Sequence, residues 1–271
     1  MAIFQTQIQG RGGSAPALYI EKYNNNGTLE NRYVINSLNG ITAIGDYVLY
    51  GAFRGITTTT QIPDFSNITT VGSYGLNNAF RGSTGLQGNV DLSSVTSVAT
   101  YGLSSTFSGC TNIGTVDLSS LATINTESAI DNLCYQSGIT SLDLSGLTTI
   151  NAVYACRALC YQSTSLTSID LSNLQSIGGY YACAWAFSGC TGLTNVDLSG
   201  LTEIVMGAQS GTSRGSQCYY MFSGCTNLVS VDLRNLGRVD SNSSIAYMFS
   251  GCTSLQNVNL SKLITTNTIA M

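Results

Sequence analysis

A segment of about fifteen residues recurs along most of this chain, and this repetition constrains the fold more than any other feature. Clear copies read FSGCTNIGTVDLSSL from Phe107, FSGCTGLTNVDLSGL from Phe187 and FSGCTNLVSVDLRNL from Phe222. A unit this short cannot enclose a core alone, so it buries its apolar side only by stacking on its neighbours. The repeat therefore predicts a solenoid. Its acidic position recurs every 26 or 27 residues, with one step of 35, at Asp64, Asp91, Asp117, Asp143, Asp170, Asp197 and Asp232, and Asn259 takes the last place.

Within each unit the apolar residues follow the pattern LxxLxLxxL, as in Ile113, Val116, Leu118, Leu121 and Ile124. The central Val-x-Leu alternates between inward and outward side chains, which is typical of a short strand. If these strands stack in register, they form a parallel sheet with a column of aspartates on its outer surface, and this is what the pattern predicts.

These units resemble the BspA-type leucine-rich repeats of bacterial surface proteins, which share the aromatic-x-Gly-Cys start and the following Leu-x-x-Val/Ile pattern. The resemblance covers roughly residues 34–263. It implies an α/β-type leucine-rich-repeat solenoid with a parallel β-sheet on one face and short strands, turns and helical segments on the other. For function it implies binding or adhesion.

The sequence divides into three parts. Residues 1–16 are interpreted as an attachment arm and a glycine-rich joint, in which Ile3, Phe4 and Ile8 alternate with polar residues and suit addition to a partner's sheet. A frayed terminus is the alternative. Residues 17–33 surround Asn26-Gly27 and predict a β-hairpin that caps the first coil, and residues 34–271 form the solenoid.

Two local departures from the repeat are informative. The long step places extra residues at 205–217, a Gly- and Ser-rich surface loop whose only charge is Arg214. This loop is either a contact site or a tolerated insertion. The last unit carries Asn259 in place of aspartate and adds Lys262, and a lysine on an edge strand resists edge-to-edge association. We therefore expect a free C-terminal end.

Composition argues against several classes of function. Charged residues make up 9% of the chain, the net charge is −4 and histidine is absent. Nucleic-acid binding needs clustered Lys and Arg, and no Ser/His/Asp, Cys/His or HExxH constellation can be assembled. We expect neither an enzyme nor a cofactor. The first residues lack the basic start and apolar stretch of a secretory signal, and no segment has the length and apolarity of a membrane span.

The nine cysteines recur at repeat positions, for example Cys110, Cys190 and Cys225 in FSGC. We interpret them as buried, reduced residues that act as small apolar members of the repeat. No zinc site is expected, because Cys156 and Cys160 lack a second pair at ligand spacing.

The aspartate column has two interpretations. Like charges on neighbouring strands repel by about 1 kcal/mol per pair at 4 Å in water, so something must offset the repulsion. Each carboxylate either accepts hydrogen bonds from the backbone just beyond it or helps to form a strip that binds cations or glycan hydroxyls. The candidate binding residues are Asp91, Asp117, Asp143, Asp170, Asp197 and Asp232, together with Arg214. A group of tyrosines either forms a second contact surface or packs within the protein. They are Tyr180, Tyr181, Tyr219, Tyr220 and Tyr247.

Two functional hypotheses remain open. In the first, the protein is a bacteriophage virion component, such as a tail fibre or receptor-binding protein. It binds other virion proteins through its N-terminal arm and presents the solenoid to a host surface glycan or protein. In the second, it is an extracellular adhesin on a bacterial cell surface. The arm, the free cysteines and the missing export signal favour the first, and the repeats favour the second. A homo-oligomer is compatible with both.

Overall fold

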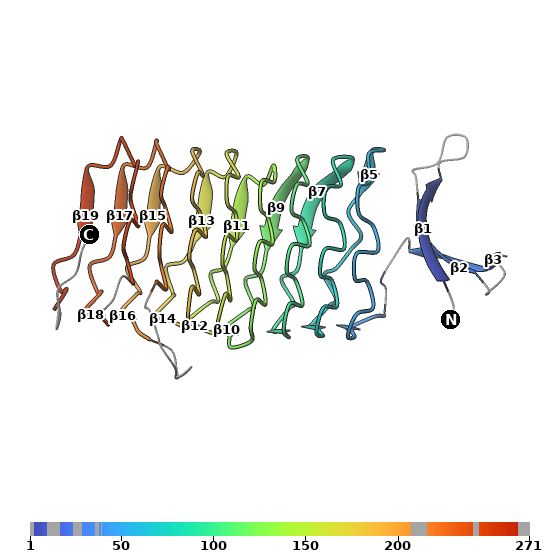
Figure 1. The fold of residues 1–271 in the computed structure, drawn as a ribbon, viewed down its shortest axis with the longest axis horizontal. Helices are drawn as coiled ribbons and strands as arrows, with labels where there is room; N and C mark the ends of the chain where they lie inside the picture. The colour runs from blue at the N-terminus through green and yellow to red at the C-terminus, as the bar shows by residue number, and fades with distance from the viewer. Residues whose placement is uncertain are drawn as a thin grey trace.

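The computed structural model describes residues 3–9, 17–23, 29–35, 38, 40–206, 216–240 and 244–264. From Leu38 onward these residues form a solenoid of eight stacked coils, whose short strands run side by side along its length (Figure 1). Parallel pairing joins strands of successive coils, for example Leu142 to Val116 and to Ile169. The predicted solenoid is therefore confirmed.

The first β-face carries the aspartate column. Its strands are β5 (Thr60–Gln61), β7 (Leu86–Asp91), β9 (Ile113–Asp117), β11 (Ser141–Asp143), β13 (Ser168–Asp170), β15 (Asn195–Asp197), β17 (Ser230–Asp232) and β19 (Asn257–Asn259). Two ladders, β5 to β13 and β15 to β19, make up this face. Within them Asp143 pairs with Asp117 and Asp170, so the carboxylates do lie in register.

A second parallel face accompanies the first, where the sequence pattern predicted only one sheet. Its strands are β4 (Ala43–Ile44), β6 (Thr70–Val71), β8 (Ser97–Val98), β10 (Thr123–Ile124), β12 (Thr149–Asn151), β14 (Ser176–Gly178), β16 (Glu203–Ile204) and β18 (Arg238–Val239). Each is centred on the last apolar residue of the repeat pattern, such as Ile124 paired with Ile150. Thr and Ser occupy most of its outward positions.

The third face is a ribbon of consecutive turns, and the expected helical segments are absent from the described residues. Alternate backbone N–H groups donate to the next coil, as Leu76 does to Gly102 O at 2.9 Å, while those between donate three residues back, as Asn77 does to Tyr74 O at 3.3 Å. An α-helix would keep every such donor within its own segment. The ribbon therefore replaces helix because half of its donors bind the neighbouring coil.

Columns of identical side chains fill the core. Phe53, Phe80 and Phe107 stack with ring centroids 5.3 and 5.7 Å apart. Phe187 and Phe222 repeat the arrangement at 5.5 Å. These rings are almost fully buried. Each coil thus covers the apolar side chains of its neighbours, and the buried residues form one continuous core.

The cysteines have a definite place in this scheme. The Cys110 thiol donates to Phe80 O at 3.1 Å, and Ser83 one coil earlier donates in the same way to Phe53 O at 2.8 Å. A small donor at this position satisfies a buried carbonyl of the preceding coil, which explains why either Ser or Cys is found there. All nine cysteines are free thiols and eight are buried. Burial raises the pKa of Cys110 to about 12, which leaves its thiol unreactive.

An antiparallel sheet of three strands lies at the N-terminal end of the solenoid (Figure 1). β2 (Ala17–Tyr23) and β3 (Leu29–Ile35) form the expected hairpin, although β3 extends past residue 33 into the segment assigned to the solenoid. β1 (Ile3–Gln9) pairs with β2 over its whole length, so the first residues do not lie outside the sheets of their own chain. The alternation of apolar and polar residues in this segment is compatible with pairing to a partner's sheet and equally with pairing to a strand of the same chain.

Candidate ligand-binding surface

The outer surface of the turn ribbon is rich in aromatic residues, and we call it the aromatic face. Eight aromatic residues define it, and all have positive φ angles between 50° and 57°. They are Tyr47, Tyr74, Tyr101, Tyr154, Tyr181, Trp185, Tyr220 and Tyr247. The two β-faces present mainly Ser, Thr, Asn and Asp, so the three faces of the solenoid differ in chemistry.

These rings form two stacks along the solenoid. The first contains Tyr47, Tyr74 and Tyr101, with centroids 4.8 and 4.9 Å apart and planes within 12°. The second runs through Tyr154, Tyr181, Trp185, Tyr220 and Tyr247, with successive centroids 4.8 to 6.2 Å apart and planes within 25°. Ring faces within the stacks cover one another. Edges and phenol hydroxyls are consequently what the face presents to a ligand.

Large side chains at these positions carry a conformational cost, because their φ angles are positive. A non-glycine residue in the left-handed region costs about 1–2 kcal/mol, and Gly51 occupies an equivalent ribbon position with φ 60°. Stacking returns about 0.5–1.5 kcal/mol per ring pair, which offsets much of that cost. Tyr47 and Tyr247, at the two ends of the face, are 60% and 53% exposed, and the six rings between them are partly exposed. The face is both packed and available for contact.

A charged pair marks the break between the two stacks. Ser128 takes the ribbon position of Tyr101 and Tyr154, and its buried hydroxyl has no hydrogen-bond partner among the described residues. Beside it the Arg157 guanidinium lies over the Tyr154 ring, 4.4 Å from the centroid. It donates twice to Asp131, at 3.2 and 2.9 Å. Burial raises the pKa of Asp131, and the hydrogen bonds and charge of Arg157 partly oppose that shift.

Charges of both signs lie on the aromatic face, since Arg157 pairs with Asp131 and the Tyr101 hydroxyl donates to Glu127 at 3.2 Å. Arg54 and Arg81 are exposed on the same ribbon as Arg157. Sequence reasoning found Tyr180, Tyr181, Tyr219, Tyr220 and Tyr247, which the structure brings together. It missed Trp185, Arg157 and the stack from Tyr47 to Tyr101, although the 27-residue spacing of those tyrosines was a usable signal.

The aspartate column is explained by turn geometry. Each carboxylate accepts a hydrogen bond from the backbone N–H two residues further on, as Asp143 does from Ser145 at 2.8 Å and Asp197 from Ser199 at 2.8 Å. The same bond is made by the other members, Asp64, Asp91, Asp117, Asp170 and Asp232, and by Asn259. The predicted backbone hydrogen bonds are thereby confirmed, and binding of cations or glycan hydroxyls by the same carboxylates stays a prediction. In the part of the chain that the structure describes, no group of three or more acidic or cysteine side chains is arranged to hold a metal ion.

This bond gives a direct prediction for Asp143. Replacement by alanine removes the acceptor and should lower the free energy of unfolding by about 1 kcal/mol. Asp143→Asn keeps the acceptor, as Asn259 does naturally, and should change stability by less than about 0.5 kcal/mol. Urea denaturation of both variants measures the difference. Equal effects of the two substitutions would show that the carboxylate charge, rather than the hydrogen bond, matters here.

The remaining sequence candidates are not part of the aromatic face. Arg214 lies outside the described residues. Ile3, Phe4 and Ile8 lie on β1, at one edge of the N-terminal sheet, so that edge stays available for pairing within the described sheet order. Their role in attachment stays a prediction.

Parallel coils with inward leucines, stacked in register on one another, define a leucine-rich-repeat solenoid. The BspA type leucine rich repeat region matches this chain in six copies over residues 21–157 and 155–270, and the chain belongs to that family. Repeats of this family are typically non-enzymatic binding domains. Comparison with curated proteins gave no match. No helix among the described residues is long and apolar enough to cross a membrane.

Proposed function

We propose that this protein is a non-enzymatic binding protein that contacts its ligand through the aromatic face. The observation that carries the proposal is the set of eight exposed or partly exposed aromatic side chains on one ribbon, where Arg157 lies over the Tyr154 ring and Arg54 and Arg81 are exposed. Tyr, Trp and Arg are the residues most enriched where binding energy concentrates in interfaces. In the part of the chain that the structure describes, the strands of the two β-faces carry no comparable set of aromatic residues.

The shape of the molecule supports presentation of such a surface. Eight coils at about 4.8 Å each extend the aromatic face over roughly 40 Å, long enough for several contacts at once. The N-terminal sheet lies at the opposite end from β19, and the free edge of β1 can add to the sheet of a carrier protein.

We further propose that the carrier is a virion and that the ligand is a glycan or protein on a host cell. Attachment through Ile3, Phe4 and Ile8 would leave the solenoid pointing outward. A bacterial cell-surface adhesin is the second candidate, and family membership favours binding in either setting. Neighbouring genes distinguish them, since capsid and tail genes support the virion and a transporter or wall-sorting context supports the adhesin.

The test removes rings without disturbing the backbone. Asparagine tolerates positive φ and already occupies equivalent ribbon positions at Asn78 and Asn132. Trp185→Asn combined with Tyr220→Asn should therefore leave the fold intact and weaken binding to target cells by about 30-fold or more. Flow cytometry with fluorescently labelled protein measures the binding.

The matched control places the same residue on the second β-face. Thr123 and Thr149 point outward there, so Thr123→Asn with Thr149→Asn should leave binding unchanged. If the ribbon variant bound as tightly as the unsubstituted protein, the aromatic face would not be the contact surface.

A further inference from the structure

The C-terminal end of the solenoid leaves part of the apolar core uncovered. Leu260 and Leu263 in the last described coil are only half-buried. Their counterparts one coil earlier, Leu233 and Leu236, are 2% and 0% exposed. Val258, Leu255 and Phe249 show the same loss of cover. Each of these positions is normally closed by the next coil, which supplies the same residue types.

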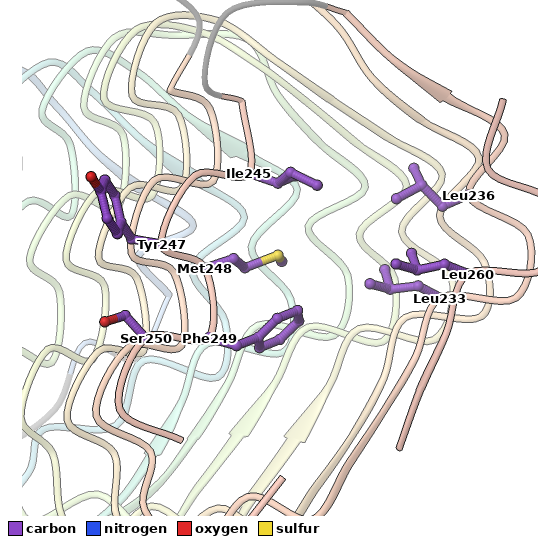
Figure 2. A pocket seen from close by; sticks show the side chains of 8 residues that line it. All are labelled: Leu233, Leu236, Ile245, Tyr247, Met248, Phe249, Ser250 and Leu260. Carbon is purple, nitrogen blue, oxygen red and sulfur yellow. The ribbon is translucent and has the colours of Figure 1, made fainter. Parts of the chain in front are cut away.

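A cavity of about 400 Å³ opens at this end. Ile245, Met248 and Phe249 point from the turn ribbon towards Leu236 and Leu260 on the opposite wall, while Tyr247 points away from it (Figure 2). The lining is apolar apart from the rim, so water gains few hydrogen bonds there. An open apolar end of this kind favours contact with another apolar surface.

A free strand edge lies beside the cavity. β19 is the last strand of its ladder, and among the described residues no strand pairs with its outer side. Its backbone donors and acceptors are therefore arranged to accept one more strand. Its outward residues are Asn257 and Asn259, so the acidic column ends in neutral amides at this edge.

Charges near this edge are already engaged. Arg234 pairs with Asp232, and Arg238 pairs with Asp240. Lys262 donates from its ammonium to Asn235 Oδ1 at 2.7 Å, in the preceding coil. The acceptor is an uncharged amide, so the exposed ammonium of Lys262 keeps its positive charge, and its effect on pairing at this edge stays a prediction.

From this we propose that a second copy of the chain docks on this end, with the two solenoids related by a two-fold axis and the two β19 strands antiparallel. Pairing centred on Val258 sets Asn257 opposite Asn259 of the second copy and Lys262 opposite its Ser254, so no like charges meet. The two cavities close against each other and the core runs through both chains. Such an interface is isologous and stops at a dimer.

The test uses substitutions that extend the column of aspartates to the last strand. Asn257→Asp with Asn259→Asp changes only exposed side chains, and the carboxylate introduced at position 259 would make the turn bond found in every earlier coil. In the dimer the two substitutions create two facing carboxylate pairs, which should weaken association by about 30-fold. Analytical ultracentrifugation of the full chain over a wide concentration range gives the dissociation constant. Ser141→Asp on β11, which pairs with both β9 and β13, adds charge away from the end and should leave the dissociation constant unchanged.

Other occupants of the cavity give different results. A full chain that is monomeric throughout would overturn the proposal. If a variant ending at Ile264 then dimerised, residues 265–271 would be the cover instead. A dimer insensitive to the Asn257 and Asn259 substitutions would also overturn it, because association would then use another surface.

Discussion

Replacing Phe107 by alanine should lower the free energy of unfolding by about 3–5 kcal/mol. The Phe107 ring is fully buried and stacks on Phe80 with centroids 5.7 Å apart and planes within 7°. Its removal leaves a cavity that contacts the coils on both sides. In a solenoid the coupling between neighbours is the main source of stability, so a central cavity weakens two interfaces at once.

The matched control is Phe249→Ala, at the same repeat position in the last coil. Phe249 is only half-buried and has a ring on one side, Phe222, at 6.1 Å. The expected loss is about 1–2 kcal/mol. Urea denaturation followed by circular dichroism measures both. Equal losses at Phe107 and Phe249 would contradict the idea that stability depends on cover from both neighbours.

Replacing Arg157 by methionine should destabilise the protein by about 2–3 kcal/mol at pH 7, less than for a fully buried pair because the Arg157 side chain is 37% exposed. The substitution leaves the buried Asp131 carboxylate without its partner. The pKa of Asp131 is already raised by burial, and loss of the Arg157 hydrogen bonds and charge raises it further. In the variant, the ionised form of Asp131 therefore costs the folded protein more free energy than it does in the unsubstituted protein.

The sign of the pH dependence follows from that shift. A carboxyl with a raised pKa in the folded state binds its proton more tightly there than in the unfolded chain, so folding is favoured at low pH and loses this contribution as pH rises. The destabilisation by Arg157→Met should therefore be small near pH 3.8, the ordinary aspartate pKa, and should grow as pH rises towards 7.

Two controls separate this effect from lost packing. Arg81→Met removes an exposed arginine of the same ribbon and should change stability by less than about 0.5 kcal/mol. Asp131→Asn in the Arg157→Met background should recover much of the loss at pH 7, since a neutral amide is easier to bury. Thermal unfolding at several pH values gives the comparison. A loss independent of pH would assign the effect to packing over Tyr154.

Sequence analysis predicted those features of the site that depend on the residues of a single repeat unit. Asp143 followed by Leu and Ser is turn chemistry in any unit, so its hydrogen bond to the Ser145 backbone could be anticipated. The aromatic face was only partly found. Its second stack passes from Tyr181 to Trp185 within one coil and then follows a different column to Tyr220. A search along one repeat position does not reveal that shift.

The sequence by itself determined the period, the inward residues and the outward aspartates, because an apolar pattern repeated at a fixed spacing can be buried only by stacking. Tertiary structure decided which groups the backbone binds. The N–H of Leu76 donates to Gly102 in the next coil, and the ribbon forms turns instead of a helix. β1 likewise pairs with β2 in its own chain. In each case the local pattern allows two hydrogen-bond partners, and the choice depends on which one the folded chain brings within reach.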